Sequence, residues 1–521
     1  MSDNTDYSMI SDYNDAPMLQ VPEFKDAYAS RHRAAYLCLV ALGILISAIL
    51  YKWSAGVSWE YSTKVTLVFG LFVCIAHIIW RVRSKPRNYL APDVFYIIFY
   101  AAFHFAFLAL WLFGVVDASG PAGQRVFRAP EQYYLVMFIV NLGLLGFLFG
   151  YELAAPKKQF DVSTKKRKIP TAGWTLAGVT FMLLALIIHL YFIFGIGIRT
   201  WLTEGYTVYM RMERYSQYYR LWRIQFHIFS LGFGVYITSV ALRYRRLFRG
   251  KLGITLFFIY LFLLVLEGGR THMVTLGMIL LLVRHFVIKR IKLKSIIIIA
   301  IIALTAFSSL KIVRSVAAFD VPKMIEILKH ARQTEQTHWY DPLVEMGSSV
   351  NTVNLTIMLV PENEPYWHGR SYIQTIVHII PYLSGILSRY LGLVPSGWLT
   401  YTHFGLGAAG TGFSISAEGY LNFGLPGVFF HMAIIGIFLR RIYARFAATM
   451  SPASTLVFII AYGLFMITVR NHVNLLVTPL VRIIVTGWLL KNLCGEEEVS
   501  TNHEEPVLYG QEDYGKALIY E

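Results

Sequence analysis

Residues 252–288 read LGITLFFIYLFLLVLEGGRTHMVTLGMILLLVRHFVI, two apolar runs separated by a short polar break. About 18 apolar residues suffice for a helix to cross the roughly 30 Å hydrocarbon core of a bilayer. The stretch therefore predicts two membrane helices joined by a tight turn. An arginine at the centre of a membrane helix costs about 2.5–3.5 kcal/mol on insertion scales. Arg270, which lies at the break, therefore predicts an anionic partner.

The same pattern recurs along the whole chain, whose 521 residues are 56% hydrophobic and only 15% charged. Apolar runs of this kind lie at residues 34–51, 61–80, 91–116, 132–151, 171–194, 222–242, 252–267, 271–288, 294–310, 413–438, 453–469 and 473–493. Only helices and closed barrels satisfy their backbone hydrogen bonds inside a lipid bilayer. We therefore predict an all-α integral membrane protein with about 12 transmembrane helices.

The positions of Lys and Arg predict the topology. Basic clusters follow the second, fourth, sixth, eighth and tenth runs, as expected of cytoplasmic loops. With both termini cytoplasmic, residues 311–412 then form a large periplasmic loop between spans 9 and 10, and 372–394 is an amphipathic or re-entrant segment. The expected parts of the chain are an acidic tail at 1–33, spans 1–9 at 34–310, this loop, spans 10–12 at 413–494 and a second acidic tail at 495–521.

The composition also excludes several classes of protein. The net charge of +16 is divided among short loops, which argues against nucleic-acid binding. The three cysteines, Cys38, Cys74 and Cys494, have no metal-binding or disulfide spacing, and the first span resembles a signal anchor. The chain has no ATP-binding P-loop, no Asp-x-Asp pair and no cytoplasmic loop large enough for a nucleotide-sugar domain. We expect no metal and no cofactor, and a transferase of this kind would need a donor already activated on a lipid.

Cations gather on the predicted outer face, opposite to the usual bias. Arg470 lies in a second polar break at residues 469–474, and further arginines flank other outer loops, namely Arg211, Arg214 and Arg314. Arg482 falls near the midplane of the last helix, where we expect it to face the bundle interior. One guanidinium group can bind two phosphate oxygens at once, so the cluster of arginines predicts a pyrophosphate ligand. The tyrosines near these arginines suit a bound sugar. Arg482 could equally form a structural ion pair, and some outer arginines could be interfacial anchors, namely Arg199, Arg220 and Arg223.

The loop at 311–412 contains the remaining motifs. It carries His368-Gly-Arg370-Ser-Tyr372 and ends in a glycine-rich run up to Gly412, which leads into Glu418 and Tyr420 at the start of the next helix. Such a loop could close over a substrate at the outer mouth of the bundle.

Three of these motifs, in this order, resemble those of the oligosaccharide repeat-unit polymerases of the Wzy type, which make O-antigen, exopolysaccharide and common antigen. They are the Gly-Gly-Arg-Thr turn at 268–271, Gly-Arg-Ser-Tyr at 369–372 with Pro381, and residues 418–424, read EGYLNFG. The break at Arg470 looks like that of the common-antigen branch, although that branch lacks a Glu at the position of Glu418. The resemblance covers residues 250–493.

The resemblance implies a glycosyltransferase of the GT-C type in the bacterial inner membrane, which needs no metal. It would transfer the growing glycan from undecaprenyl pyrophosphate to an incoming lipid-linked repeat unit at the outer face. Arg270 and Arg470 would stabilise the pyrophosphate leaving group, and His403 or Glu418 would act as the general base. The expected substrate contacts are Arg211, Arg214, Arg314, Arg370, Tyr372, Tyr420, Arg482 and Glu267, the last of which could instead pair with Arg270.

Three rival functions fit the same charges. A lipid-linked oligosaccharide flippase or other transporter also needs intramembrane arginines, but the chain lacks the repeated halves that such transporters often have. An O-antigen ligase uses the same donor with another acceptor, and an assembly subunit would carry out no chemistry. Expected partners are polyprenyl-pyrophosphate-linked oligosaccharides, membrane lipids, a chain-length regulator and a flippase.

Overall fold

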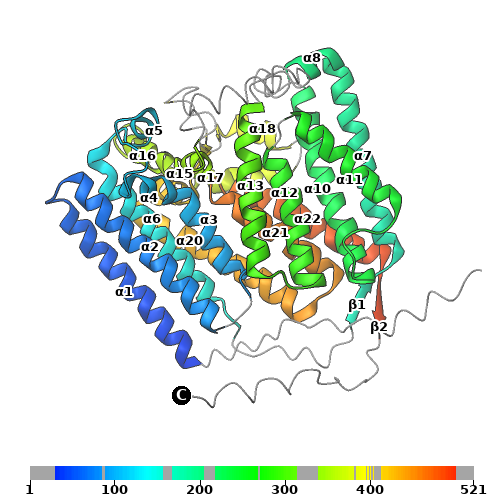
Figure 1. Ribbon diagram of the computed structural model, residues 1–521, viewed down its shortest axis with the longest axis horizontal. Coiled ribbons are helices and arrows are strands. Elements are labelled where there is room, and N and C mark those ends of the chain that lie inside the picture. The colour runs from blue at the N-terminus through cyan, green and yellow to red at the C-terminus, as the bar shows by residue number, and fades with distance from the viewer. Residues whose placement is uncertain are drawn as a thin grey trace, which may run out of the picture.

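The computed structural model of the chain is a bundle of helices (Figure 1). The structure describes residues 30–84, 88–156, 167–204, 217–267, 270–313, 338–380, 383–394, 396–397, 399, 403 and 412–499. Within these ranges a few side chains, including that of Arg270, are not described.

The elements follow one another as a nearly unbroken series of helices. Up to residue 313 they are α1 (Ser30–Ser54), α2 (Trp59–Ser84), α3 (Pro92–His104), α4 (Ala106–Leu112), α5 (Pro121–Val126), the 3₁₀ turn η2 (Pro130–Gln132), α6 (Tyr133–Leu153), β1 (Arg167–Pro170), α7 (Ala172–Ile196), α8 (Ile198–Glu204), α10 (Gln217–Tyr244), α11 (Lys251–Glu267), α12 (Arg270–Val283), the π-helical turn η3 (Arg284–Ile288) and α13 (Leu293–Val313). After residue 338 they are α15 (Asp341–Gly347), α16 (Val350–Leu359), α17 (Arg370–Ile379), α18 (Leu383–Tyr390), α20 (Ile415–Thr449), α21 (Pro452–Thr468), α22 (Asn474–Cys494) and β2 (Glu496–Val499).

Every predicted apolar run lies on a helix or, for residues 91–116, mainly on a pair of helices. Within the described residues, seven helices are long and apolar enough to cross a membrane, namely α1, α2, α6, α7, α10, α20 and α22. The pair α3 and α4, bent by 59°, would make an eighth span. The other four runs lie on α11, α12 with η3, α13 and α21. The apolar parts of these helices that the structure describes are shorter than the roughly 18 residues needed to span a bilayer. The chain is thus a multi-pass, mainly helical membrane protein, and the count of twelve spans stays a prediction.

Helices α6 and α20 pack in direct backbone contact at the centre of the bundle. A Cβ atom added to Gly150 of α6 would lie 1.9 Å from the carbonyl oxygen of Ala433, and one added to Gly436 of α20 would lie 2.3 Å from that of Phe147. Only a residue without a side chain fits at such distances. Small residues at helix contacts are a common device in membranes, where packing replaces the hydrophobic effect between helices.

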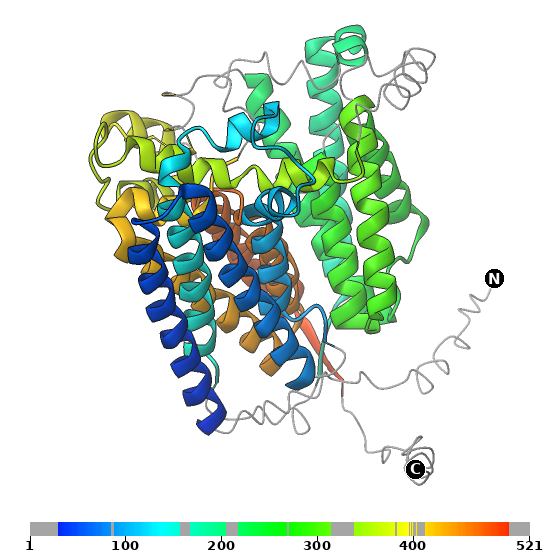
Figure 2. The ribbon, with the colours of Figure 1, turned by 60° about the vertical axis from the view of Figure 1, so that its left-hand side comes forward.

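The two ends of the bundle are built differently. At the lower end in Figure 1, β1 pairs with β2 in antiparallel register, so that the chain before α7 meets the chain after α22. Lys168 and Arg243 lie 3.6 Å and 3.5 Å from Glu498 and Glu497 there, so the first residues of the C-terminal acidic tail form a strand beside basic side chains. The short helices α15 to α18 lie at the opposite end (Figures 1 and 2).

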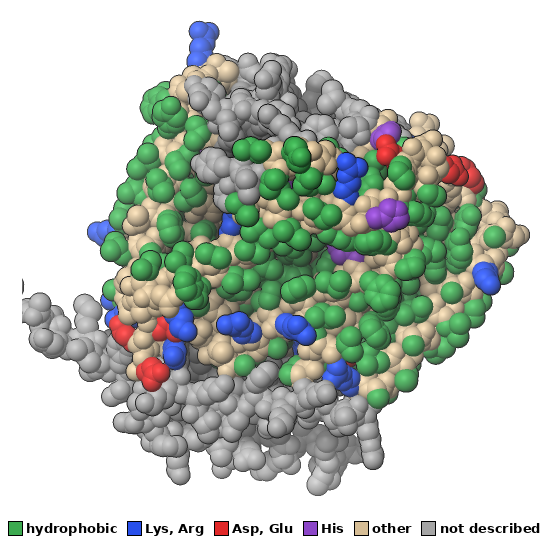
Figure 3. Space-filling view, turned by 180° about the vertical axis from the view of Figure 1, so that it is seen from behind, with side chains coloured by type: hydrophobic (Ala, Val, Ile, Leu, Met, Phe, Trp, Pro, Cys, Tyr) green, Lys and Arg blue, Asp and Glu red, His purple; other side chains and the backbone are tan. Residues whose placement is uncertain are grey.

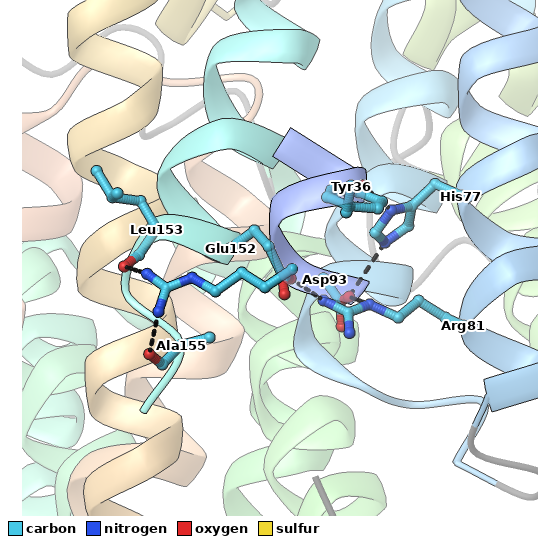
Figure 4. Close-up of polar contacts among 8 residues, drawn as sticks. Tyr36, His77, Arg81, Asp93, Glu152, Leu153 and Ala155 are labelled. Carbon is cyan, nitrogen blue, oxygen red and sulfur yellow. Dashed lines mark hydrogen bonds and ion pairs between the residues drawn. The ribbon is translucent and has the colours of Figure 1, made fainter. Parts of the chain in front are cut away.

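A buried charge cluster joins α2, α3 and α6 (Figure 4). Arg81 is 7% exposed, and its guanidinium contacts the Asp93 carboxylate and lies 2.9 Å from Glu152 Oε2. His77 Nε2 lies 3.0 Å from the same Asp93 oxygen, and the His77 Nδ1 atom contacts the Tyr36 hydroxyl of α1. Two carboxylates and two basic side chains therefore satisfy one another where four helices meet.

Two of the basic residues that we counted as cytoplasmic loop charges are buried. Arg81 belongs to the charge cluster, and Arg440 of α20 is buried with its guanidinium 5.2 Å from the ring centroid of Tyr151. The assumption that these two side chains are solvated in loops is wrong, because α2 and α20 continue past the apolar runs and carry both arginines into the packed interior. Their neighbours Arg83 and Arg441 are exposed.

The apolar stretch 372–394 does not form one long helix. It is divided between α17, of 10 residues, and α18, of 8 residues. At 1.5 Å per residue, a 10-residue helix is only about 15 Å long, half the thickness of a bilayer core. Neither helix can cross a membrane.

Candidate functional site

The end of the long loop lies directly on the Arg470 break. The backbone N–H of Phe413 donates to the carbonyl oxygen of Arg470 at 2.9 Å. Gly412 adopts a positive φ of 74°, and a Cβ there would lie 2.5 Å from the Arg470 carbonyl oxygen and 2.6 Å from its Cγ. Only glycine fits this contact without strain. The last residue of the predicted glycine hinge is therefore packed against the arginine that we predicted to bind pyrophosphate.

Glu418 joins three segments from within the protein. It is 1% exposed, its Oε2 atom accepts the backbone N–H of Val473 at 2.6 Å, and its Oε1 atom accepts the Ser396 hydroxyl at 3.1 Å. Val473 caps the first turn of α22, where the helix dipole favours a negative charge. One carboxylate on α20 thus holds both the loop around Ser396 and the chain that follows Arg470.

Asn422, one turn further along α20, fixes the start of α17. Its Oδ1 atom accepts the backbone N–H of Gly369 at 3.0 Å, and its Nδ2 group donates to the Ser371 hydroxyl at 2.9 Å and to the Glu418 carbonyl at 2.8 Å. Gly369 has a φ of 87°, so the Gly-Arg-Ser-Tyr motif begins α17 from a left-handed turn. The two motifs that we recognised as separate sequence patterns are one hydrogen-bonded unit.

A break in α20 separates this unit from the rest of the helix. Phe423 and Gly424 have non-helical backbone angles, and Pro426 follows inside the helix. Proline removes one intrahelical hydrogen bond and crowds the preceding turn, which explains a break at this position. The turns before the break carry Glu418, Tyr420 and Asn422, and are oriented by their contacts with the loop.

Aromatic side chains surround the unit. Tyr366 meets the largely buried Tyr420 edge to face, with ring centroids 6.0 Å apart. Tyr372 of α17 meets His431 of α20 in the same way, at 5.2 Å. Burial raises the pKa of the Tyr372 hydroxyl well above its ordinary range, and the nearby Glu418 carboxylate adds to the shift. Tyr372 therefore stays a neutral hydrogen-bond donor at neutral pH.

The predicted His403 and Arg370 lie on the surface of the loop. His403 is exposed, and its Nε2 atom lies 3.3 Å from Glu364 Oε1. Arg370 is exposed as well, and its Nη2 group donates to the Gly392 carbonyl at 2.7 Å. The polar groups of both side chains are therefore accessible to a ligand at the surface of the protein. His403 differs in this respect from Glu418, the other candidate base, which is enclosed.

At the polar break of Arg270, α11 ends at Glu267 and α12 begins at Arg270, and the predicted glycine turn at residues 268–269 lies outside the described residues. Arg270 is the first residue of α12, and its side chain lies outside the described part of the structure. Glu267, the last residue of α11, is buried, and its Oε1 atom lies 3.0 Å from His189 Nε2 of α7. This ion-pair partner was absent from our predictions, because nothing in the sequence relates residue 189 to residue 267.

Arg470 is half-buried, with its guanidinium carbon 6.0 Å from the ring centroid of Phe103 of α3. Arg482 is exposed, so the prediction that it faces the bundle interior is wrong. Most buried residues of α22 form one stripe, Leu476, Leu480, Ile483, Gly487 and Leu490, and Arg482 lies away from this stripe, one turn after the buried Thr478.

Three of the predicted substrate-binding arginines, Arg211, Arg214 and Arg314, lie outside the described residues. Among the residues that are described, no group of three His, Cys, Asp or Glu side chains could hold a metal ion. The residues that the structure brings together are those of the loop end, the first turns of α20, the start of α17 and the Arg470 break. Sequence reasoning assigned no role to Ser371, Ser396 and Asn422, although Ser371 and Asn422 stand inside two of the quoted motifs.

A comparison with known families agrees with this arrangement. The family model described as "O-antigen polysaccharide polymerase Wzy" matches residues 35–497. The chain belongs to this family. The match extends over nearly all the described helices, including the first six predicted spans, where we had found only a general likeness in hydropathy. No significant match was found among curated proteins or solved structures.

Membership of the Wzy family establishes the general activity and setting. The protein is an O-antigen repeat-unit polymerase in general terms, and its family acts on lipid-linked oligosaccharide repeat units in the inner membrane. The recognition of a Wzy-type polymerase from the three motifs is thereby confirmed.

Proposed function

We propose that the protein polymerises undecaprenyl-pyrophosphate-linked repeat units at the outer face of the inner membrane, through a GT-C-type transfer of the growing chain to an incoming unit. The observation that carries this proposal is the position of Arg470. It is half-buried, and the loop end and Glu418 hold the backbone on both sides of it. This end of the bundle is opposite the strand pair and, in the predicted topology, faces the periplasm.

The chemistry follows from the leaving group. As the glycosidic bond to the lipid pyrophosphate breaks, negative charge develops on the phosphate oxygens. A guanidinium group fixed in advance near those oxygens stabilises the transition state more than the ground state, because little reorganisation is needed during the reaction. Arg470 and Arg270 are assigned this role, with Arg211, Arg214, Arg314 and Arg482 as further phosphate or sugar contacts.

The structure favours different roles for the two candidate bases. Both Glu418 oxygens accept hydrogen bonds within the protein, which supports a role in positioning the Arg470 break. His403 is exposed and paired with Glu364, as a group that removes a proton from an entering sugar hydroxyl would be. In this assignment Arg370, Tyr372 and Tyr420 contact sugar, and Glu267 positions the Arg270 turn through His189.

Reconstitution tests this function. We expect the purified protein in lipid vesicles to lengthen lipid-linked repeat units into a ladder of polymers, with no added nucleotide and in the presence of a chelator. The Arg470→Ala protein is the matched control and should leave the substrate unchanged. A requirement for a nucleotide sugar would contradict the lipid-linked donor. Transfer to a different lipid acceptor without lengthening would indicate a ligase, and movement of the substrate across the bilayer without lengthening would indicate a transporter.

A further inference from the structure

Helix α17 has its polar face inside the protein and its apolar face outside. Ser371, Gln374 and Thr375 are 2–3% exposed, whereas Ile373 and Ile376 are 51% and 64% exposed. A helix on the surface of a water-soluble domain has the reverse arrangement. The outer face of α17 is therefore suited to an apolar surrounding.

The apolar surface continues beyond α17. The large hydrophobic side chains that follow it are also exposed, namely those of Ile380, Ile386, Tyr390, Leu391 and Val394. A contiguous apolar patch of this kind marks a contact with a protein or with a membrane. We call residues 370–394 the interfacial segment.

Lipid is the occupant that the surroundings favour. Helix α17 packs against α22 and α20, both of which are long and apolar enough to span a membrane. The outer faces of these two helices are mainly apolar as well, as shown by the exposed Ile484 and Trp488 of α22 and Phe430 and Phe438 of α20, although the exposed Arg482 also lies on α22. Figure 3 shows the apolar surface continuing from the upper band of the molecule down this face, until a row of basic side chains crosses its lower part.

A buried histidine without hydrogen-bond partners among the described residues packs against Tyr372 of α17. His431 of α20 is 7% exposed, and neither of its ring nitrogens has a hydrogen-bond partner among the residues that the structure describes. Tyr372 of the interfacial segment is a ring neighbour of His431. A buried polar group without a partner is unfavourable, and a polar ligand that accepts its hydrogen bond would remove that cost.

We propose that the interfacial segment lies in the plane of the membrane surface with its isoleucines among the acyl chains, and that the lipid-linked substrate enters the site laterally beneath α17, where His431 donates a hydrogen bond to its head group. The orientation of α17 stands by itself, whereas the entry of the substrate rests on the proposed function. A helix in this position lets the polyprenyl tail remain in the bilayer while the head group reaches the polar inner face of α17.

Nitroxide accessibility tests the orientation without any assay of activity. Cys38, Cys74 and Cys494 are replaced, and a single spin-labelled cysteine is placed at Ile373 or Ile376 of the full chain in lipid vesicles. We expect both positions to be accessible to oxygen, which dissolves in lipid, and protected from a water-soluble nickel chelate. Ile484→Cys on α22 provides the lipid-exposed control and Glu362→Cys on the loop provides the water-exposed control, since both residues are exposed.

Two results would overturn the orientation. Access of the nickel chelate to residues 373 and 376, at the level found for residue 362, would place α17 in water. Protection from both reagents would mean that protein covers the segment, such as a second copy of the chain. If labelling at either position prevents folding, Ile386→Cys on α18 replaces it, because this residue is 69% exposed.

His431→Phe tests the route of the substrate. Phenylalanine keeps the ring contact with Tyr372 and removes two unpartnered nitrogens, so the melting temperature should stay the same or rise. We expect the KM for the lipid-linked substrate to rise roughly tenfold or more, because a hydrogen bond to a charged head group is lost, with a smaller change in kcat. His104→Phe is the control for burial. Both nitrogens of His104 are within hydrogen-bond distance of a partner, and its loss should lower the melting temperature.

An unchanged KM in His431→Phe would overturn lateral entry past His431 while leaving the polymerase function intact. Failure of the unaltered protein to lengthen its substrate would instead refute the proposed function, and the accessibility result would still stand.

Discussion

Replacing Arg470 by Ala should abolish polymer formation while single repeat units still reach the outer face of the membrane. Loss of one preorganised donor to a developing negative charge typically lowers kcat by about 10²–10³-fold. Arg470→Lys should retain part of the activity, since an ammonium keeps the charge but not the paired donors of a guanidinium. Arg270→Ala is expected to have the same effect, because both polar breaks are assigned to the same leaving group.

The measurement is the length distribution of surface polysaccharide in cells that depend on the variant. Arg441→Ala is the matched control, since Arg441 is an exposed arginine in the last third of α20, beyond the break and away from the loop. It should leave the polymer unchanged. If either Arg470→Ala or Arg270→Ala instead prevents repeat units from reaching the outer face, the protein moves its substrate, and the polymerase assignment of these two arginines fails.

Asp93→Ala should destabilise the protein by about 3–5 kcal/mol, the usual cost of breaking a buried ion pair from one side. Asp93 is 2% exposed and accepts both Arg81 and His77, so its removal leaves the Arg81 charge buried with Glu152 as its remaining partner in the cluster. Thermal unfolding in detergent or nanodiscs measures the change. The triple variant Arg81→Met, Asp93→Leu and Glu152→Gln should be less destabilised than Asp93→Ala, because no charged group of the cluster is then left buried without its partner.

The control for this prediction is Glu60→Ala on the same α2 helix. Glu60 is exposed and pairs with Lys64 at 2.7 Å, and such surface pairs contribute little to stability. An Asp93→Ala protein that melts within a degree or two of Glu60→Ala would show that the charge cluster does not stabilise the bundle.

The places where sequence reasoning failed have two causes. The apolar runs locate the helices well, but they do not report which side of a helix meets the rest of the protein, and Arg482 was misplaced for that reason. They also do not report how far a helix continues past its apolar run, and Arg81 was misplaced because α2 extends beyond residue 80 and the Arg81 side chain is buried there. A helix that contacts both lipid and protein is apolar on most of its surface, so the sequence gives only a weak indication of its rotation.

The site could be predicted in part. The loop end, Glu418 and the Arg470 break were identified as separate motifs, whereas their mutual contacts were not. Ser396 and Val473 lie 22 and 55 residues from Glu418 along the chain, and the single carboxylate that accepts both can be identified only when the helices are packed. The same holds for the Glu267–His189 pair and for the bonds from Asn422 to Gly369 and Ser371.

The sequence by itself determined that this protein is a multi-pass helical membrane protein with arginines at two polar breaks, because long apolar runs must form helices wherever lipid offers no hydrogen bonds. Only the tertiary structure decided which residues from other elements contact those breaks and fix their position. A buried polar atom takes its partner from whichever helix packs beside it, and the partners of Glu418, Glu267 and Asp93 all come from other elements. The outward apolar face of α17 was decided in the same way, because its polar side chains are buried inside the protein.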